Sequence, residues 1–211
     1  MTTLPGRLAR FICIAAALTF TTAGAAARAA AVVGQPAPEF TAPDLAGRAV
    51  RLADYRGKFV VLEWTNPGCP FVRKHYQQSG NLPALQKEFT ARGVAWIALN
   101  STETGHPDYL APAQLGKWFS ERDAAPSVAL MDVSGTVGRA YGAKTTPHLY
   151  VIDPAGKLVY AGAIDSIPSA SADDIRGATN YVRQALTQAM AGEPVSTPTS
   201  VAYGCSIKYA R

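Results

Sequence analysis

An α/β fold, with a mixed central β-sheet sandwiched between helices, is the class that the sequence predicts. Short β-rich runs alternate with helical stretches from Val33 onward, which is the pattern of sheet and helix layers. Residues 59–64 are almost wholly apolar, as a strand buried on both faces would be. Two further apolar runs flank the turn at residues 153–156, so an antiparallel hairpin joins the sheet.

The amino-acid composition excludes some classes of protein. The chain has 211 residues, of which 48% are hydrophobic and 17% charged, so it suits one compact domain and excludes a disordered polyelectrolyte. Its formal net charge is +5, but no run of five or more like charges is present. The sequence therefore predicts no nucleic-acid partner.

The first thirty residues have the pattern of a secretory signal peptide. Arg7 and Arg10 precede an apolar run at residues 11–20, and Ala27-Arg28-Ala29 offers small residues for cleavage. The alternative is a retained membrane anchor, but the apolar run is about half of the ~20 residues that span a bilayer. We expect an exported protein, periplasmic or extracellular, with no stable membrane anchor after cleavage.

The signal-peptide pattern divides the chain into three segments. Residues 1–30 are the signal peptide and contain Cys13, residues 31–192 form the domain, and residues 193–211 form a flexible tail that carries Cys205. Cleavage would leave two cysteines in a compartment that permits disulfides.

The expected strands begin with an N-terminal β-hairpin, whose arms flank the turn residues 44–47. Three core strands and a second hairpin follow. In order, the expected strands are residues 40–42, 49–52, 59–64, 94–99, 128–131, 149–152 and 158–161.

The expected helices are marked by their ends. One begins at Cys69-Pro70, because proline is favoured in a first helical turn, and pauses at Gly80, after which Asn81 caps a continuation. Residues 112–124 and 137–141 are also predicted helical. The last helix is expected to start at Ser171 and to place Ile175, Val182, Leu186 and Met190 on one face.

Cys69 is the candidate nucleophile. It follows a buried strand directly and stands at the start of a helix, where unpaired backbone N–H groups and the helix dipole favour a thiolate. Arg73 and Lys74 lie one turn further on and add positive charge unless they point to solvent. The alternative is that Cys69 is a small buried hydrophobic residue, as many free cysteines are.

Four stretches resemble the thioredoxin-like superfamily, and its redoxin or peroxiredoxin-like branch (alkyl hydroperoxide reductase/thiol-specific antioxidant) most of all. They are residues 34–40, 55–58 and 64–70, and Thr146-Pro147 followed by a hairpin. The resemblance covers about residues 33–190. It implies a thioredoxin-like fold in which Cys69 attacks, Pro147 is a cis-proline facing it, and the Thr146 backbone meets a bound chain or disulfide. The alternative for Thr146-Pro147 is an ordinary turn before a strand.

The sequence departs from the family in two ways. Thioredoxin-type reductases have a Cys-x-x-Cys motif, but Val72 stands where the second cysteine would be, which excludes a local dithiol. Peroxiredoxins have Thr or Ser three residues before the cysteine, where this chain has Asn66, with Thr65 one residue earlier. Pro147 lies where their peroxide-binding arginine is expected, so Arg139 or Arg73 would have to replace it.

Cys205 is the candidate partner of Cys69, because a thiol on a flexible tail can reach a distant sulfur. It can act as a resolving thiol, form a static disulfide, or remain unpaired. The sequence leaves these three alternatives open.

Glu63 lies six residues before Cys69, where thioredoxins have a buried acid that relays protons. A carboxyl buried there would have a raised pKa and could accept a proton during disulfide exchange. The alternative is a glutamate that faces water. His75 and His148 are either metal ligands beside Cys69 or hydrogen-bonded surface histidines.

The leading functional hypothesis is an exported thiol-dependent oxidoreductase. The Cys69 thiolate would attack a peroxide or a protein or small-molecule disulfide, and an unidentified thiol reductant would restore it, without a bound cofactor. One alternative is a copper-handling protein that uses Cys69, His75 and Cys205, since soft Cu(I) prefers thiolates. Another is a non-catalytic binding domain.

Overall fold

The computed structural model describes residues 1–2 and 30–210. Cys13 and nearly all of the predicted signal peptide therefore lie outside the described residues. Within the part of the chain that is described, no helix is long and apolar enough to cross a membrane.

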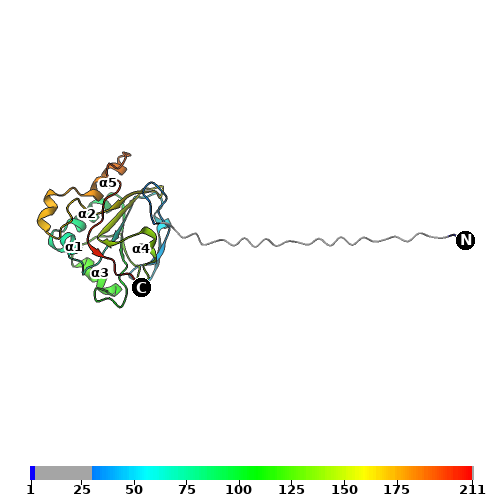
Figure 1. The fold of residues 1–211 in the computed structure, drawn as a ribbon, viewed down its shortest axis with the longest axis horizontal. Coiled ribbons are helices and arrows are strands. Elements are labelled where there is room, and N and C mark those ends of the chain that lie inside the picture. Colours follow the sequence, from blue (N-terminus) through cyan, green and yellow to red (C-terminus); the bar gives the residue numbers. More distant parts are fainter. Residues whose placement is uncertain (3–29, 211) are drawn as a thin grey trace.

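A five-stranded mixed sheet forms the centre of the domain, in the order β5-β4-β3-β7-β8. Strands β3, β4 and β5 run parallel to one another. Strand β7 pairs antiparallel with β3, and β8 pairs antiparallel with β7. This confirms the predicted fold class (Figure 1). The bounds are β3 Val60–Trp64, β4 Ala95–Asn100, β5 Val128–Met131, β7 His148–Ile152 and β8 Leu158–Gly162.

Two small sheets complete the strands. The predicted N-terminal hairpin is present as β1 Thr41–Pro43 and β2 Ala49–Arg51. The other small sheet joins β6 Thr145–Thr146 to β9 Cys205–Ser206, two segments that are 60 residues apart in sequence.

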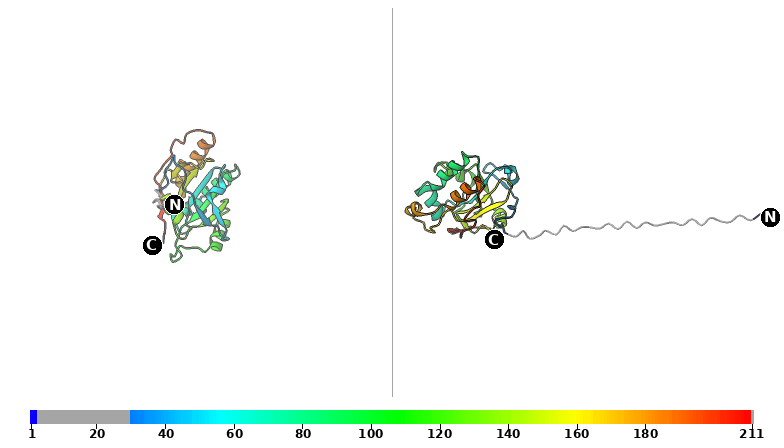
Figure 2. Two further views of the ribbon diagram at one scale, coloured as in Figure 1. Left: turned by 90° about the vertical axis from the view of Figure 1, so that its right-hand side faces the viewer. Right: turned by 90° about the horizontal axis from the view of Figure 1, so that it is seen from above.

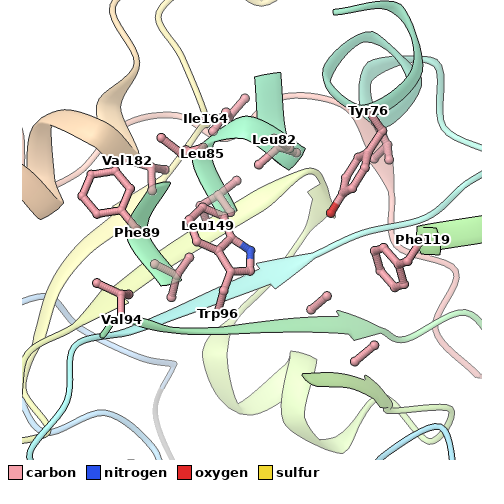
Figure 3. Close-up of a cluster of buried hydrophobic side chains, with 14 of the residues drawn as sticks. Tyr76, Leu82, Leu85, Phe89, Val94, Trp96, Phe119, Leu149, Ile164 and Val182 are labelled. Atoms are coloured by element: carbon pink, nitrogen blue, oxygen red, sulfur yellow. The ribbon is translucent and has the colours of Figure 1, made fainter. Parts of the chain in front are cut away.

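The helices cover the two faces of the sheet unequally. The first face packs against α1 Pro70–Arg73, α2 Asn81–Thr90, α3 Pro112–Ser120 and α5 Tyr181–Met190. The second face packs against α4 Thr136–Tyr141, the hairpin and the 3-10 turn η1 Leu52–Tyr55. Figure 3 shows the apolar cluster on the first face, with Tyr76 and Trp96 both reaching into it.

A π-helical turn, η2 Lys74–Gln78, follows α1 without a break. Three residues in succession at the start of this turn, Lys74, His75 and Tyr76, are all buried. Gly80 then separates this turn from α2, as predicted.

The last helix is shorter than predicted. Residues Ala172–Gly177 form a separate 3-10 turn, η3, and α5 begins only at Tyr181. The Asn180 side chain accepts a hydrogen bond from the Arg183 backbone at 2.9 Å, so Asn180 rather than Ser171 is the cap. Ile175 consequently does not share the buried face of Val182 and Leu186.

The tail, residues 193–211, is predicted to be flexible, but its described part is docked along the domain. The Ala161 backbone accepts from Ser200, the Lys144 carbonyl accepts from Ile207, and the Ala143 carbonyl accepts from the Tyr209 hydroxyl at 2.8 Å. The end of the tail lies beside α4, where Arg139 donates to the Ala210 carbonyl (Figures 1 and 2). The tail therefore crosses the same end of the sheet as the loop after β3.

Candidate functional site

The turn after β3 holds Cys69 in place. The Asn66 side chain accepts a hydrogen bond from the Gly68 backbone at 2.7 Å, and the Asn66 carbonyl accepts from Cys69 at 3.0 Å. Cys69 is the residue that caps the start of α1, and Pro70 occupies the first helical position. Cys69 is only 1% exposed, so a bulky reactant reaches its sulfur only after a local movement.

The Thr146-Pro147 peptide bond is cis, as the family resemblance implies. The Cys69 thiol donates to the Thr146 carbonyl at 3.1 Å, although 77 residues separate them. The Thr146 hydroxyl is buried without a hydrogen-bond partner among the described residues. These contacts bring the predicted nucleophile and the predicted Thr146-Pro147 site together.

Cys205 lies at the same place. Strand β9 pairs with β6 in antiparallel register, which sets Cys205 opposite Thr146. Gly204 adopts a φ of +133°, and a side chain there would collide with the Thr146 carbonyl, so only glycine permits this close approach. The structure thus joins both cysteines to one residue, Thr146, and both thiols are free.

Electrostatics keep Cys205 protonated. Burial, the neighbouring Cys69 and, to a smaller extent, Asp108 together raise the pKa of Cys205 to about 12, against an opposing effect of Lys208. Cys205 therefore keeps its proton at neutral pH in the docked tail. A protonated thiol is a poor nucleophile, which argues against Cys205 as the group that attacks the substrate disulfide first.

Glu63 is fully buried on the face of the sheet that carries Cys69. Its carboxyl accepts from the Tyr76 hydroxyl at 2.6 Å, the Trp96 indole at 2.7 Å and the Gln86 amide at 3.1 Å. Burial raises its pKa, and these three donors work against that rise. The alternative that Glu63 faces water is wrong, but the described partners of its carboxyl do not include Cys69.

The remaining predicted residues have these positions. Thr65 is buried at the end of β3, with its hydroxyl near the Glu63 carboxyl but outside hydrogen-bond geometry. Arg73 donates to the Gly68 carbonyl at 3.0 Å. Arg139 packs on the Tyr209 ring, 4.6 Å away, and is engaged by the tail. Neither arginine has a described contact with the Cys69 sulfur.

Both candidate histidines are more buried than predicted. Burial lowers the pKa of His75 and of His148 to about 4, so each is neutral at pH 7. The His148 ring stacks on Tyr150, and the His75 ring accepts from Asn81. Within residues 1–2 and 30–210, no three or more His, Cys, Asp or Glu side chains form a group that could hold a metal ion.

A hollow of about 450 Å³ opens beside the Cys69 turn. Its lining includes Pro67 and Gly68 from the turn and Arg73 from α1, together with Asp108 and Trp118. A larger hollow, of about 580 Å³, lies between the end of α5 and the β7–β8 hairpin. Neither cysteine lines either hollow, but the smaller one borders the turn that holds Cys69.

Sequence reasoning missed two residues near this site. Asp165 and Tyr203 are joined by a hydrogen bond between the buried carboxylate and the tail hydroxyl. The position of Tyr203 two residues before the candidate thiol Cys205 was the only hint in the sequence, and it predicts no contact with Asp165. Nothing in the sequence around Asp165 marked it.

Comparison with known proteins identifies the family. The model of the AhpC/TSA family matches residues 33–161. The thiol-disulfide oxidoreductase ResA of Geobacillus thermodenitrificans (strain NG80-2) is 33% identical over 132 residues, which span 62% of this chain and 69% of the relative.

Two solved structures share the fold over most of the chain. An uncharacterized conserved protein from Geobacillus kaustophilus is 29% identical with a TM-score of 0.70, over 85% of this chain and 93% of that one. The hypothetical protein SMc02350 from Sinorhizobium meliloti 1021 is 24% identical with a TM-score of 0.72, over 86% and 97%. The chain belongs to the AhpC/TSA family, on the thioredoxin-like fold, and is a thiol-based oxidoreductase.

Proposed function

We propose that this protein is an exported thiol-disulfide oxidoreductase in which Cys69 attacks a disulfide and Cys205 resolves the intermediate. The observation that carries the proposal is the pairing of Cys205 with Thr146, whose carbonyl accepts the Cys69 hydrogen bond. A second cysteine held at that carbonyl supplies the thiol that the missing Cys-x-x-Cys motif would have provided. The ResA relatives, named thiol-disulfide oxidoreductases, support disulfide over peroxide as the substrate. Export rests on the sequence of residues 1–30.

The reaction has two exchange steps. The Cys69 thiolate attacks one sulfur of the substrate disulfide, the substrate S–S bond breaks, and one half leaves as a thiolate. Cys205 then attacks the Cys69 sulfur of the mixed disulfide, and its proton passes to the second leaving thiolate. The substrate gains two electrons and the chain is oxidised to a Cys69–Cys205 disulfide, which a dithiol reductant outside the chain reduces.

Four of the predicted site residues have separate roles in this scheme. Glu63 has a raised pKa and lies on the Cys69 side of the sheet, so we assign it to proton transfer through intervening groups or water rather than by direct contact. Thr146 and Pro147 present the backbone at which the exchanging sulfurs meet, and Thr65 lines the buried end of β3.

The test uses a peptide disulfide at one equivalent, without added reductant. We expect the wild-type chain to reduce it, Cys69→Ser to lose at least 100-fold in rate, and Cys205→Ser to stop as a stable Cys69 mixed disulfide. A parallel experiment replaces the peptide disulfide with hydrogen peroxide. Fast oxidation of Cys69 by peroxide with no reaction with the peptide would overturn the assignment to disulfide exchange.

A further inference from the structure

A buried polar cluster joins the tail to the domain next to the thiols. It consists of Lys74 and His75 from η2, Asp165 from the loop after β8, and Tyr203 from the tail. The residues Lys74, His75 and Asp165 are 0%, 0% and 3% exposed. Burying charged groups so completely is costly unless they are paired, so the partners of each group decide what the cluster does.

Asp165 is the centre of the cluster. Its carboxylate accepts from the Tyr203 hydroxyl, and the Lys74 ammonium lies 3.5 Å from its other oxygen. Lys74 also donates to the Ile167 carbonyl at 3.3 Å and lies 5.7 Å from the centre of the Tyr203 ring. Tyr203 thus contacts both charges of the pair at once.

His75 adds a third contact to Tyr203. The Asn81 amide donates to Nδ1 of His75 at 2.9 Å, which leaves the proton of the neutral ring on Nε2. That nitrogen faces the Tyr203 hydroxyl at 3.4 Å and the Asp165 carboxylate at 3.7 Å. The Tyr203 hydroxyl can therefore accept from His75 while it donates to Asp165.

Tyr203 is only two residues before Cys205. The Phe71 ring packs edge-on against Tyr203, with 5.7 Å between centroids, and Gly204 then brings the chain against the Thr146 carbonyl. A single residue, Gly204, separates Tyr203 from Cys205, so the two positions are closely linked along the chain. Whatever fixes Tyr203 consequently limits where Cys205 can meet Thr146.

We propose that Asp165 and Tyr203 are positioning residues, which form with Lys74 and His75 a latch that holds Cys205 at Cys69. This rests on the proposed resolving role of Cys205. When the latch is closed, the tail covers Cys69 and the two thiols are aligned for the resolving step. When it opens, Cys69 is accessible to a bulky disulfide.

Acid favours opening. Four groups face the His75 ring: Lys74, the Asp165 carboxylate, the Tyr203 hydroxyl and the neutral Asn81 amide. In the closed latch, burial lowers the pKa of His75 to about 4, from 6.5. Departure of Tyr203 admits water and returns the pKa towards 6.5, so the open state takes up a proton between those values. Opening becomes more favourable by at most about twenty-fold from pH 7 to pH 5.

The first experiment measures opening in the full chain with Cys69→Ser. The rate at which dithiodipyridine modifies Cys205 is divided by its rate with a synthetic peptide of residues 198–211 at each pH, and the Cys205 fragment is identified by mass spectrometry. We expect this ratio of rates to rise five- to twenty-fold from pH 7 to pH 5. His75→Gln should make the ratio nearly independent of pH. Tyr203→Phe should raise the ratio at least ten-fold at pH 7.

Tyr209→Phe is the matched control, because it removes a tail hydroxyl that donates to the Ala143 carbonyl, outside the latch. It should keep the wild-type pH profile. An acid-insensitive wild type, or the same profile in Tyr203→Phe and Tyr209→Phe, would overturn the latch.

The second experiment follows the resolving step with both cysteines present. Tyr203→Phe and Asp165→Asn should form the Cys69–Cys205 disulfide at least ten-fold more slowly from a preformed Cys69 mixed disulfide. Equal rates in all three proteins would reject the positioning role and leave the proposed function standing. Absence of the disulfide from the wild type would instead reject the proposed function.

Discussion

Two buried polar clusters share the π-helical turn η2, and they differ in what closes them. Tyr76 belongs to the inner cluster with Glu63, Gln86 and Trp96, whose members all come from the sheet and the two elements beside it. Lys74 and His75 belong to the outer cluster, which is completed by Tyr203 from the tail. The inner cluster is part of the core, whereas the outer one exists in full only while the tail is docked.

This difference shows that burial alone does not tell which polar groups respond to a movement of the tail. Both clusters are largely buried, and both contain a carboxylate with several donors. Only the outer cluster can be hydrated by moving a segment that also carries a thiol. We therefore expect mutations in the inner cluster to affect global stability, and mutations in the outer cluster to affect the tail first.

Replacement of Glu63, the carboxylate of the inner cluster, should have the largest effect on the free energy of unfolding. Glu63→Ala leaves the donors of Tyr76, Trp96 and Gln86 buried with fewer acceptors, and each such group costs about 1 to 3 kcal/mol. We expect the free energy of unfolding in urea to fall by about 3 kcal/mol or more. Glu39→Ala, which breaks an exposed pair with Arg56, is the control and should change it little. A small loss in Glu63→Ala would contradict the inner cluster's role.

Replacement of Asp165, the carboxylate of the outer cluster, should lower the free energy of unfolding by a smaller amount. Asp165→Ala leaves the Lys74 charge unpaired, but departure of the tail lets water reach it, so we expect a loss of about 1 to 3 kcal/mol. Limited proteolysis should then cut the tail, residues 193–211, faster than in the wild type. A tail that becomes protease-sensitive in Glu63→Ala but not in Asp165→Ala would reverse the assignment of the two clusters.

The pH dependence of stability should separate the clusters further. His75 has a pKa of about 4 when folded and 6.5 when unfolded, so the unfolded chain binds more protons below pH 6.5 and stability falls with acid. Between pH 7 and pH 5 the wild type should lose about 1 to 2 kcal/mol more than His75→Gln, as measured by urea unfolding. Parallel losses in the two proteins would show that His75 is not buried as a neutral ring.

The smallest effects come from one substitution made in each cluster. Tyr76→Phe removes a hydroxyl that donates to Glu63 and accepts from Gln86, so it should lower the free energy of unfolding by about 1 to 2 kcal/mol without slowing the resolving step. Tyr203→Phe should lower the free energy of unfolding by about 1 to 2 kcal/mol as well, but it should also slow that step. Stopped-flow mixing and urea unfolding measure the two quantities. Equal slowing in both variants would remove the distinction between the clusters.

The sheet was predictable from sequence because its signals are local. The apolar run at β3 and the turn residues of the β7–β8 hairpin mark those strands within one or two residues of their observed bounds. The last helix was predicted too long, because the break between Gly177 and Asn180 depends on tertiary contacts, including a bridge from Asn180 to Asp165. Intrinsic helix signals do not report such contacts.

The site was predictable only in part, for a related reason. Cys69 and the cis bond at Pro147 carry a local signature, and both have the expected position. The burial of Lys74 goes with contacts made across about 90 residues to Asp165 and Ile167, and the docking of Tyr203 with a contact made across 38 residues to Asp165. Charge and hydropathy patterns place a lysine and a tail tyrosine at the surface, so neither could be foreseen.

The central claim is that Cys205 is the reaction partner of Cys69. The most direct measurement is peptide mapping of the full chain by mass spectrometry, without reduction, after one equivalent of a small disulfide at pH 7. We expect one internal disulfide between Cys69 and Cys205, formed at a rate that does not depend on protein concentration. A Cys69 mixed disulfide that persists beside a free Cys205 thiol would contradict it.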